Sequence, residues 1–166
     1  MPNILILSAK TIPGIPVEGG WLAPLVLALL CVAAAVDART GRVPDLLVFF
    51  GLFFTIASEG FLVDWPFAGV HLLLALVGGL FLTSINEVWY HFRKIDAFGM
   101  GDAKWTVLAV SCFGPVPGFL AWALGAWLGL AWMGALRLAK RPIAHVHFAP
   151  FLFIGLCAGI YWLRLR

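Results

Sequence analysis

The sequence predicts an all-α polytopic membrane protein with about six transmembrane helices. Hydrophobic residues make up 63% of the 166 residues and charged residues only 11%. Soluble domains carry about 25% charged residues, so a water-soluble fold of this length could not bury so much apolar surface. The apolar residues also occur in long runs, and most of the charged residues gather in the short connectors between them.

The first apolar run follows a proline-rich segment, and we expect residues 1–19 to form an irregular N-terminal tail. Residues 20–166 are then expected to form a single six-helix membrane domain. The first predicted helix, residues 21–36, is shorter than the roughly 20 residues that a membrane span needs. We therefore expect it to continue through Asp37, which places this carboxylate at the membrane edge.

The second predicted helix covers residues 46–56, and Pro44 suits its first turn. Asp45 is expected to be a helix-start residue, stabilised by the helix dipole. A connector over residues 57–65 follows, in which we interpret Glu59 and Asp64 as loop carboxylates. The third predicted helix covers residues 66–85. Residues 86–102, the most polar part of the chain, are expected to form the next connector.

The apolar run at residues 105–136 is too long for one span, and the segment Gly114-Pro115-Val116-Pro117-Gly118 interrupts it. Two close prolines break a helix, so we predict a fourth helix over 103–113 and a fifth over 118–136. The fourth rises only about 16 Å and must be shielded from lipid by its neighbours. A connector over 137–147 precedes the sixth predicted helix, residues 148–163.

Six spans place the connectors 37–45, 86–102 and 137–147 on one side and both termini on the other. The excess of basic residues makes the first side cytoplasmic, with both termini outside. The protein is thus expected in the cytoplasmic (inner) membrane, with Asp37 and Asp102 on the cytoplasmic side. The basic residues of that side are Arg39, Arg42, Arg93, Lys94, Lys104, Arg137, Lys140 and Arg141, against Lys10, Arg164 and Arg166 on the other.

Asp37 and Asp102 are the candidate catalytic residues. Two facing carboxylates cannot both ionise cheaply, so such a pair shares one proton. The ionised member can take a proton from attacking water while the protonated member donates one, which predicts a protease. The sequence does not assign which aspartate is the acid. The structural alternative is that Asp37 pairs with Arg39 or Arg42 and that Asp102 pairs with Lys104.

The residues around Asp102 are candidate substrate-binding residues. Gly99 and Gly101 can adopt positive φ and let a substrate backbone approach closely. Lys104 is interpreted as a contact to neighbouring charge or to lipid headgroups.

No metal and no cofactor is predicted. His145 and His147 are two apart in a connector without a nearby cysteine or acidic residue, so a structural or headgroup contact is favoured over a metal site. Cys31, Cys112 and Cys157 form no metal or redox motif and are interpreted as small buried residues. The positive net charge is attributed to the connectors, so no nucleic-acid partner is expected.

Three segments resemble the type IV prepilin peptidases, the bacterial branch of the GxGD intramembrane aspartyl proteases. Residues 37–45, DARTGRVPD, resemble the first aspartate block of this family, with Asp45 where the family usually has Asn. Residues 99–104, GMGDAK, resemble the second block. Residues 147–151, HFAPF, resemble the start of the last helix of the family, which marks Pro150 as a further candidate site residue.

The resemblance implies cleavage of the basic leader from prepilin or pseudopilin precursors at the cytoplasmic membrane face. Larger members carry an N-methyltransferase domain with a paired-cysteine zinc motif. This chain has no CxxC, and it resembles the short form of the family, so we expect cleavage without methylation. The particular precursor and the oligomeric state stay open.

Two other classes of function are compatible with paired carboxylates in a membrane protein. A proton-coupled transporter would use them as a proton relay, although both lie near one face. A non-catalytic assembly component of a pilus or secretion system would have kept only the fold. Processing of a leader in whole cells separates these two classes from a peptidase.

Overall fold

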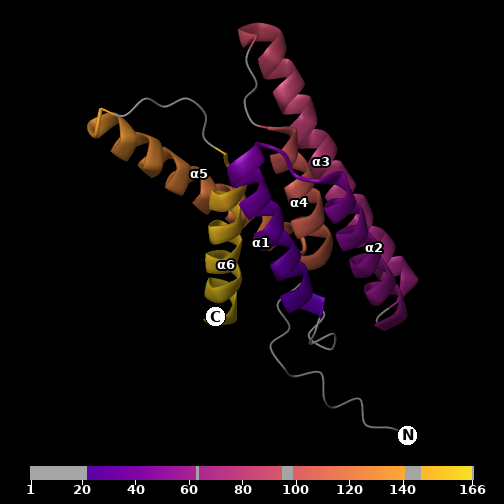
Figure 1. Ribbon diagram of the computed structural model, residues 1–166. Coiled ribbons are helices and arrows are strands. Elements are labelled where there is room, and N and C mark those ends of the chain that lie inside the picture. The colour runs from indigo at the N-terminus through magenta and orange to yellow at the C-terminus, as the bar shows by residue number, and fades with distance from the viewer. Residues whose placement is uncertain (1–21, 63, 95–98, 141–146, 166) are drawn as a thin grey trace, which may run out of the picture.

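The computed structural model describes residues 22–62, 64–94, 99–140 and 147–165, which form six α-helices and no strand (Figure 1). Four of the helices are long and apolar enough to cross a membrane, and a fifth, α6, is a shorter apolar helix. The chain is thus an all-α polytopic membrane protein, as predicted. The helices are α1 (Leu22–Thr40), α2 (Asp45–Leu62), α3 (Trp65–Arg93), α4 (Met100–Phe113), α5 (Pro115–Leu138) and α6 (Ala149–Leu165).

The helix boundaries follow the apolar runs but extend beyond several of them. Helix α1 continues through Asp37, as expected, and α4 is the shortest helix with 14 residues. The break between α4 and α5 falls at Gly114, whose φ of 80° is followed directly by Pro115. The predicted irregular tail, residues 1–19, lies outside the described residues.

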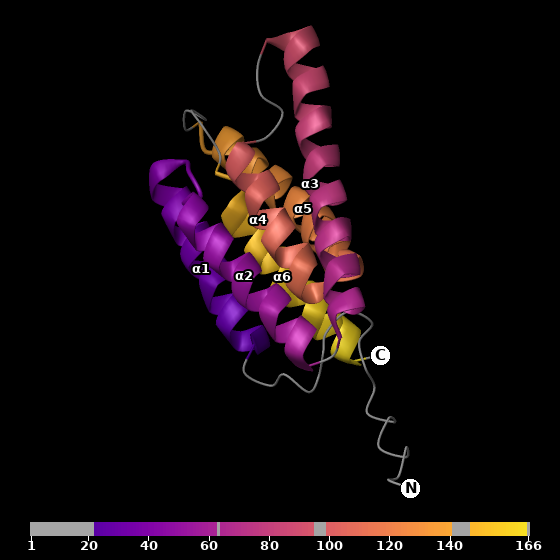
Figure 2. The same cartoon turned by 90° about the vertical axis from the view of Figure 1, so that its right-hand side faces the viewer.

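The C-terminal end of α3 corrects one prediction. Residues 86–93, expected in a connector, continue the helix to Arg93, and Lys94 ends it with a left-handed φ of 56°. Two cations lie over aromatic rings one turn earlier, Arg93 over Trp89 at 5.8 Å and Lys94 over Tyr90 at 5.7 Å. A helix of 29 residues rises about 43 Å, which exceeds the roughly 30 Å hydrocarbon core. This end of α3 accordingly projects beyond the other helices (Figures 1 and 2).

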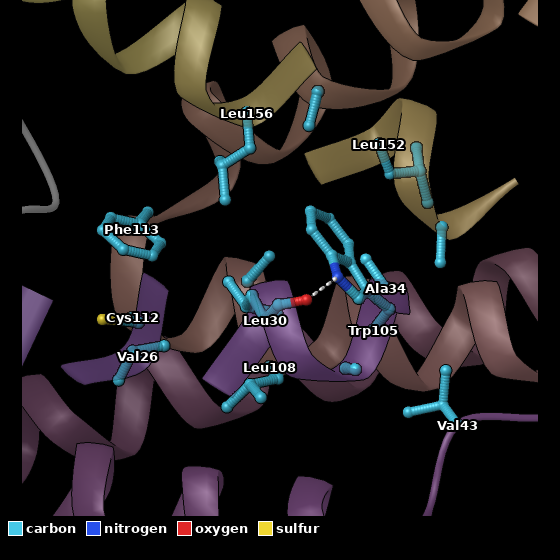
Figure 3. Close-up of a cluster of buried hydrophobic side chains, with 14 of the residues drawn as sticks. Val26, Leu30, Ala34, Val43, Trp105, Leu108, Cys112, Phe113, Leu152 and Leu156 are labelled. Atoms are coloured by element: carbon cyan, nitrogen blue, oxygen red, sulfur yellow. Dashed lines mark hydrogen bonds between the residues drawn. The ribbon is translucent and has the colours of Figure 1, made fainter. Parts of the chain in front are cut away.

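Helix α4 is the centre of the bundle. It contacts all five other helices, and all but four of its 14 residues are buried. Trp105 is fully buried and donates an indole hydrogen bond to the carbonyl of Leu30 in α1 at 3.3 Å (Figure 3). The short helix is thus shielded from lipid by its neighbours, as predicted. Its core partners include Val26, Leu30, Ala34, Val43, Leu152 and Leu156.

Glycines bring α5 and α6 into close contact. A Cβ on Gly155 would lie 2.6 Å from the carbonyl oxygen of Ala121, and one on Gly125 would lie 3.1 Å from the backbone nitrogen of Leu152. Small residues let membrane helices approach backbone to backbone, where van der Waals packing holds them together. This contact fixes the start of α6 relative to the rest of the bundle.

Glu59 is a second correction. It was interpreted as a loop carboxylate, but it lies in α2 with 1% of its surface exposed. Its Oε1 is 2.9 Å from Nδ1 of His71 in α3, while its Oε2 has no hydrogen-bond partner. A charge inside a membrane protein must be paired or neutralised, so the two residues join α2 to α3.

Among the cysteines only Cys112 is buried; Cys31 and Cys157 are exposed on the helix surfaces.

The helices alternate in direction, so the end of α1 and the start of α4 lie at the same end of the bundle (Figures 1 and 2). The end of α3, the end of α5 and the starts of α2 and α6 lie there too. Asp37 and Asp102 are therefore brought to one end, which is the arrangement that the predicted connectors required.

Candidate active site

Asp37 lies in the last turn of α1 and is 95% buried, with a relative exposure of 5%. The helix ends four residues later because Gly41 takes a left-handed φ of 67°. Its N–H donates to the carbonyl of Asp37 at 2.8 Å, which is the usual way that a glycine terminates a helix. Asp37 is therefore held at a helix end that the sequence itself sets.

Asp102 occupies the first turn of α4 and is 4% exposed. Its Oδ2 accepts the N–H of Gly99 at 3.0 Å, and its own N–H donates to the carbonyl of Gly99, also at 3.0 Å. This reciprocal pair caps the helix and fixes the side chain. One turn further on, Thr106 donates to the carbonyl of Asp102 at 2.7 Å and accepts from the indole of Trp122 at 2.8 Å.

Gly101 brings the two carboxylates together. A Cβ on Gly101 would lie 3.2 Å from Oδ1 of Asp37 and 3.1 Å from Cγ2 of Val43. Since Gly101 directly precedes Asp102, the two aspartates are neighbours across the contact between α1 and α4. Neither glycine of this segment needs the positive φ that we expected. Gly99 has φ −74° and Gly101 is helical, so the role of Gly101 is close approach.

The electrostatics of Asp102 agree with a shared proton. Burial and, after it, the neighbouring Asp37 raise the pKa of its carboxyl to about 7, although the N–H of Gly99 acts in the opposite direction. A buried carboxyl beside a second carboxylate keeps its proton near neutral pH, as general acids in enzymes do. Asp102 lies outside the segments of the described chain that are long and apolar enough to span a membrane.

The start of α6 closes the site from a third direction, which we did not predict. The start of α6 lies near the carboxyl of Asp37, with the backbone N–H of Ala149 and the imidazole of His147 on that side. The imidazole of His147 also packs on the turn after Asp37, with Cε1 3.1 Å from where a Cβ on Gly41 would stand. Pro150, the second residue of α6, is half-buried beside Ala149. The resemblance at residues 147–151 was the signal that marked this segment.

A cavity of about 510 Å³ opens next to Gly101, the residue before Asp102, although neither aspartate lines it. It is lined by the turn 41–45, by Met100 and Gly101, and by Lys104. Lys104 forms an ion pair with Asp45 at the start of α2, so the neighbouring charge that it contacts is Asp45 and not Asp102. The alternative pairing of Asp102 with Lys104 is therefore wrong. No group of three potential metal ligands is present among the described residues.

Comparison with known proteins gives one relative. The chain is 32% identical over 136 residues to a prepilin leader peptidase/N-methyltransferase of Klebsiella pneumoniae. The match covers 80% of this chain and 50% of the relative, so the chain spans about half the length of that protein. No family model and no solved structure matches. This sequence relationship supports the assignment of the chain to the prepilin peptidase family.

Proposed function

We propose that this protein is a prepilin leader peptidase of the aspartyl type, which cuts the basic leader from prepilin or pseudopilin precursors. The observation that carries the proposal is the convergence of Asp37 and Asp102, both buried and contributed by different helices. Similarity to a prepilin leader peptidase supports the substrate class. The geometry of the pair supports the aspartyl chemistry.

The chemistry needs one proton between the two carboxylates. The ionised member takes a proton from a water molecule as its oxygen attacks the peptide carbonyl carbon, and the protonated member donates to the carbonyl oxygen. Burial of both side chains strengthens these interactions, because they act in a medium of low dielectric constant. The chain supplies this pair from its own residues, and the proposal requires no metal or organic cofactor.

The cavity beside Gly101 is the proposed substrate site. It adjoins Asp37 through the narrow contact at Gly101 and has the turn after α1 as its other wall. A peptide bound there would have to reach the two aspartates past Gly101, because neither of them lines the cavity. Of the predicted substrate-binding residues, Gly101 and Lys104 line this cavity, whereas Gly99 and Pro150 do not.

The cytoplasmic face is the proposed location of this site. Basic residues gather at the end of the bundle where the two aspartates lie, and such residues favour the cytoplasmic side. The protein would then be a multi-pass protein of the cytoplasmic membrane. The described basic residues at this end are Arg39, Arg42, Arg93, Lys94, Lys104, Arg137 and Lys140.

Co-expression with a candidate prepilin tests the proposal, with leader removal read as a gel shift. The variants Asp37→Asn and Asp102→Asn keep the size of the side chain and remove its acid–base function, so both should abolish cleavage. Asp64→Asn is the matched control, since Asp64 caps α3 through Phe67 N–H and lies at the opposite end of the bundle. An asparagine can still cap the helix.

Cleavage by wild type and by the Asp64 variant, with both dyad variants inactive but inserted in the membrane, supports the peptidase. Wild-type cleavage rates in either dyad variant would show that the residue concerned is structural. Absence of cleavage by every version, with a transport activity driven by pH in its place, would favour the transporter.

A further inference from the structure

The first turn of α4 is capped by the same carboxyl group that the proposed reaction uses. Gly99, the residue at the cap position, has no side chain, and its N–H is instead bound by Oδ2 of Asp102 at 3.0 Å. A carboxyl group that exchanges a proton with the substrate is a weaker acceptor for this N–H while it does so. Because a helix end that loses its cap frays, the turn needs a support that does not depend on the carboxyl group.

Thr106 and Trp122 supply such a support through the backbone of Asp102. Thr106 is 5% exposed, and its hydroxyl donates to the carbonyl of Asp102 at 2.7 Å and accepts the indole N–H of Trp122 at 2.8 Å. The direction of both bonds is fixed, because an indole nitrogen can only donate and a carbonyl oxygen can only accept. The indole thus holds the hydroxyl hydrogen on the carbonyl of Asp102, and two bonds in series strengthen each other.

Trp122 is itself held by residues outside α4. It is half-buried in α5, and the centre of its ring lies 5.2 Å from that of Phe148, the residue directly before α6. Phe148 in turn packs on α5, since a Cβ on Gly129 would lie 3.2 Å from its Cε2. The carbonyl of Asp102 is therefore tied to the docked pair of α5 and α6, and not only to its own short helix.

A purely local role is the alternative for Thr106. Threonines inside helices commonly bond back to the carbonyl four residues earlier. Thr83 in α3 shows that arrangement, since its hydroxyl lies 3.1 Å from the carbonyl of Gly79 and donates to that of Leu80 at 2.9 Å. Thr106 differs from it, because its hydroxyl also accepts a hydrogen bond from a different helix.

We infer that Thr106 and Trp122 are positioning residues of the proposed peptidase. The indole fixes the hydroxyl, and the hydroxyl holds the carbonyl of Asp102, so the first turn of α4 keeps the carboxyl group in place while its bond to Gly99 weakens. The inference rests on the proposed function and adds to it two residues that the sequence pattern did not mark.

The kinetics of leader cleavage test the inference, measured with purified full-length protein in detergent and a prepilin substrate. Thr106→Val keeps the shape of the side chain and removes the hydroxyl, so kcat should fall about tenfold through a small displacement of Asp102. KM should stay unchanged, since neither Thr106 nor Trp122 lines the cavity. Thr106→Ser keeps the hydroxyl and should restore kcat.

Trp122→Phe removes only the indole N–H, so kcat should fall by less than in Thr106→Val. Added to Thr106→Val, it should lower kcat no further, because the indole acts through the hydroxyl that is already missing. Additive losses in the double variant would show that the two residues act separately and would overturn the inference.

Thr83→Val is the matched control, since it removes a half-buried hydroxyl that bonds back within its own helix. It should keep the wild-type kcat. If Thr106→Val also keeps the wild-type kcat and loses only thermal stability, Thr106 is structural and the inference is wrong. A kcat in Thr106→Ser as low as in Thr106→Val, or a raised KM with an unchanged kcat, would also overturn it.

Hydrogen exchange keeps the inference testable if no substrate is cleaved. The backbone N–H groups of the first turns of α4 should exchange about fivefold faster in Thr106→Val, the factor that corresponds to one lost hydrogen bond, and at the wild-type rate in Thr83→Val. Unchanged exchange in Thr106→Val overturns the inference whatever the activity. Faster exchange together with absence of cleavage by wild type counts against the proposed function alone.

Discussion

Replacing Gly101 by alanine should abolish most of the peptidase activity while leaving the fold intact. The new methyl group would stand 3.2 Å from Oδ1 of Asp37, 3.1 Å from Cγ2 of Val43 and 3.4 Å from the backbone nitrogen of Val43. These contacts are a few tenths of an ångström too short, and both neighbours are buried and held by their own partners. The carboxylate of Asp37 must therefore shift away from its place beside Asp102.

The magnitude follows from two opposed effects. Alanine is favoured over glycine in a helix by about 1 kcal/mol, which offsets much of the strain at Gly101, so the free energy of unfolding should change by less than that amount. A catalytic group displaced by up to about 1 Å loses as much as a hundredfold in rate. We therefore expect kcat/KM for leader cleavage to fall roughly ten- to hundredfold, with an almost unchanged melting temperature.

Gly78→Ala provides the matched control. Gly78 also lies inside a helix, and a Cβ there would meet no atom within 4 Å. This variant should gain about 1 kcal/mol in stability from helix propensity and keep wild-type activity. The assay is leader cleavage followed over time, beside thermal unfolding of the same samples in detergent. Wild-type cleavage by Gly101→Ala would refute the close-approach role of this glycine.

Three further predictions concern the proton shared by Asp37 and Asp102, the buried Glu59–His71 pair, and the hydrophobic core. The kcat/KM of the wild-type protein should fall as the pH rises through about 7, because Asp102 with its raised pKa must be protonated to act as the acid; a profile that is flat from pH 6 to about 8 would contradict this. His71→Ala should cost about 3–5 kcal/mol of unfolding free energy, because it leaves Glu59 buried without its partner. Replacing both residues by apolar residues of similar volume should cost much less. Denaturant titration of both variants measures the difference. Trp105→Phe should cost about 1 kcal/mol for the lost hydrogen bond to Leu30, and an equal stability of the two proteins would show that this bond contributes nothing.

The fold was largely predictable because its main determinants are local. Long apolar runs must become helices in a membrane, since only a helix satisfies its own backbone hydrogen bonds there. The break at Gly114 and Pro115 could be located because proline removes a donor and clashes with the preceding turn. The end of α3 could not be located from the sequence, because hydropathy marks only where the membrane ends. The helix continues beyond that point into the polar region, with Trp89 and Arg93 stacked on its surface.

The two aspartates could be selected from sequence because each follows or precedes an apolar run within a polar, glycine-containing segment. The remaining contacts of the site could not be predicted, since they join residues far apart in the chain. The meeting of Asp37 with His147 and Ala149 depends on how α6 packs between α1 and α5. Glu59 was misassigned for the same reason: its neighbours in sequence suggest a loop, and its partner His71 becomes visible only when α2 and α3 pack together.

The central position of α4 has a consequence for biosynthesis. Asp102 and Lys104 make this short helix a poor candidate for entering the bilayer alone, because each charge is costly at the centre of a membrane. Three of its five partners, α1, α2 and α3, precede it in the chain, so most of a binding site for α4 exists by the time the ribosome releases it. The two carboxylates can then meet before α6 is made. The last helix, α6, then adds its buried residues Ala149, Leu152 and Leu156 to the core that surrounds α4, so the core is completed in one final docking step.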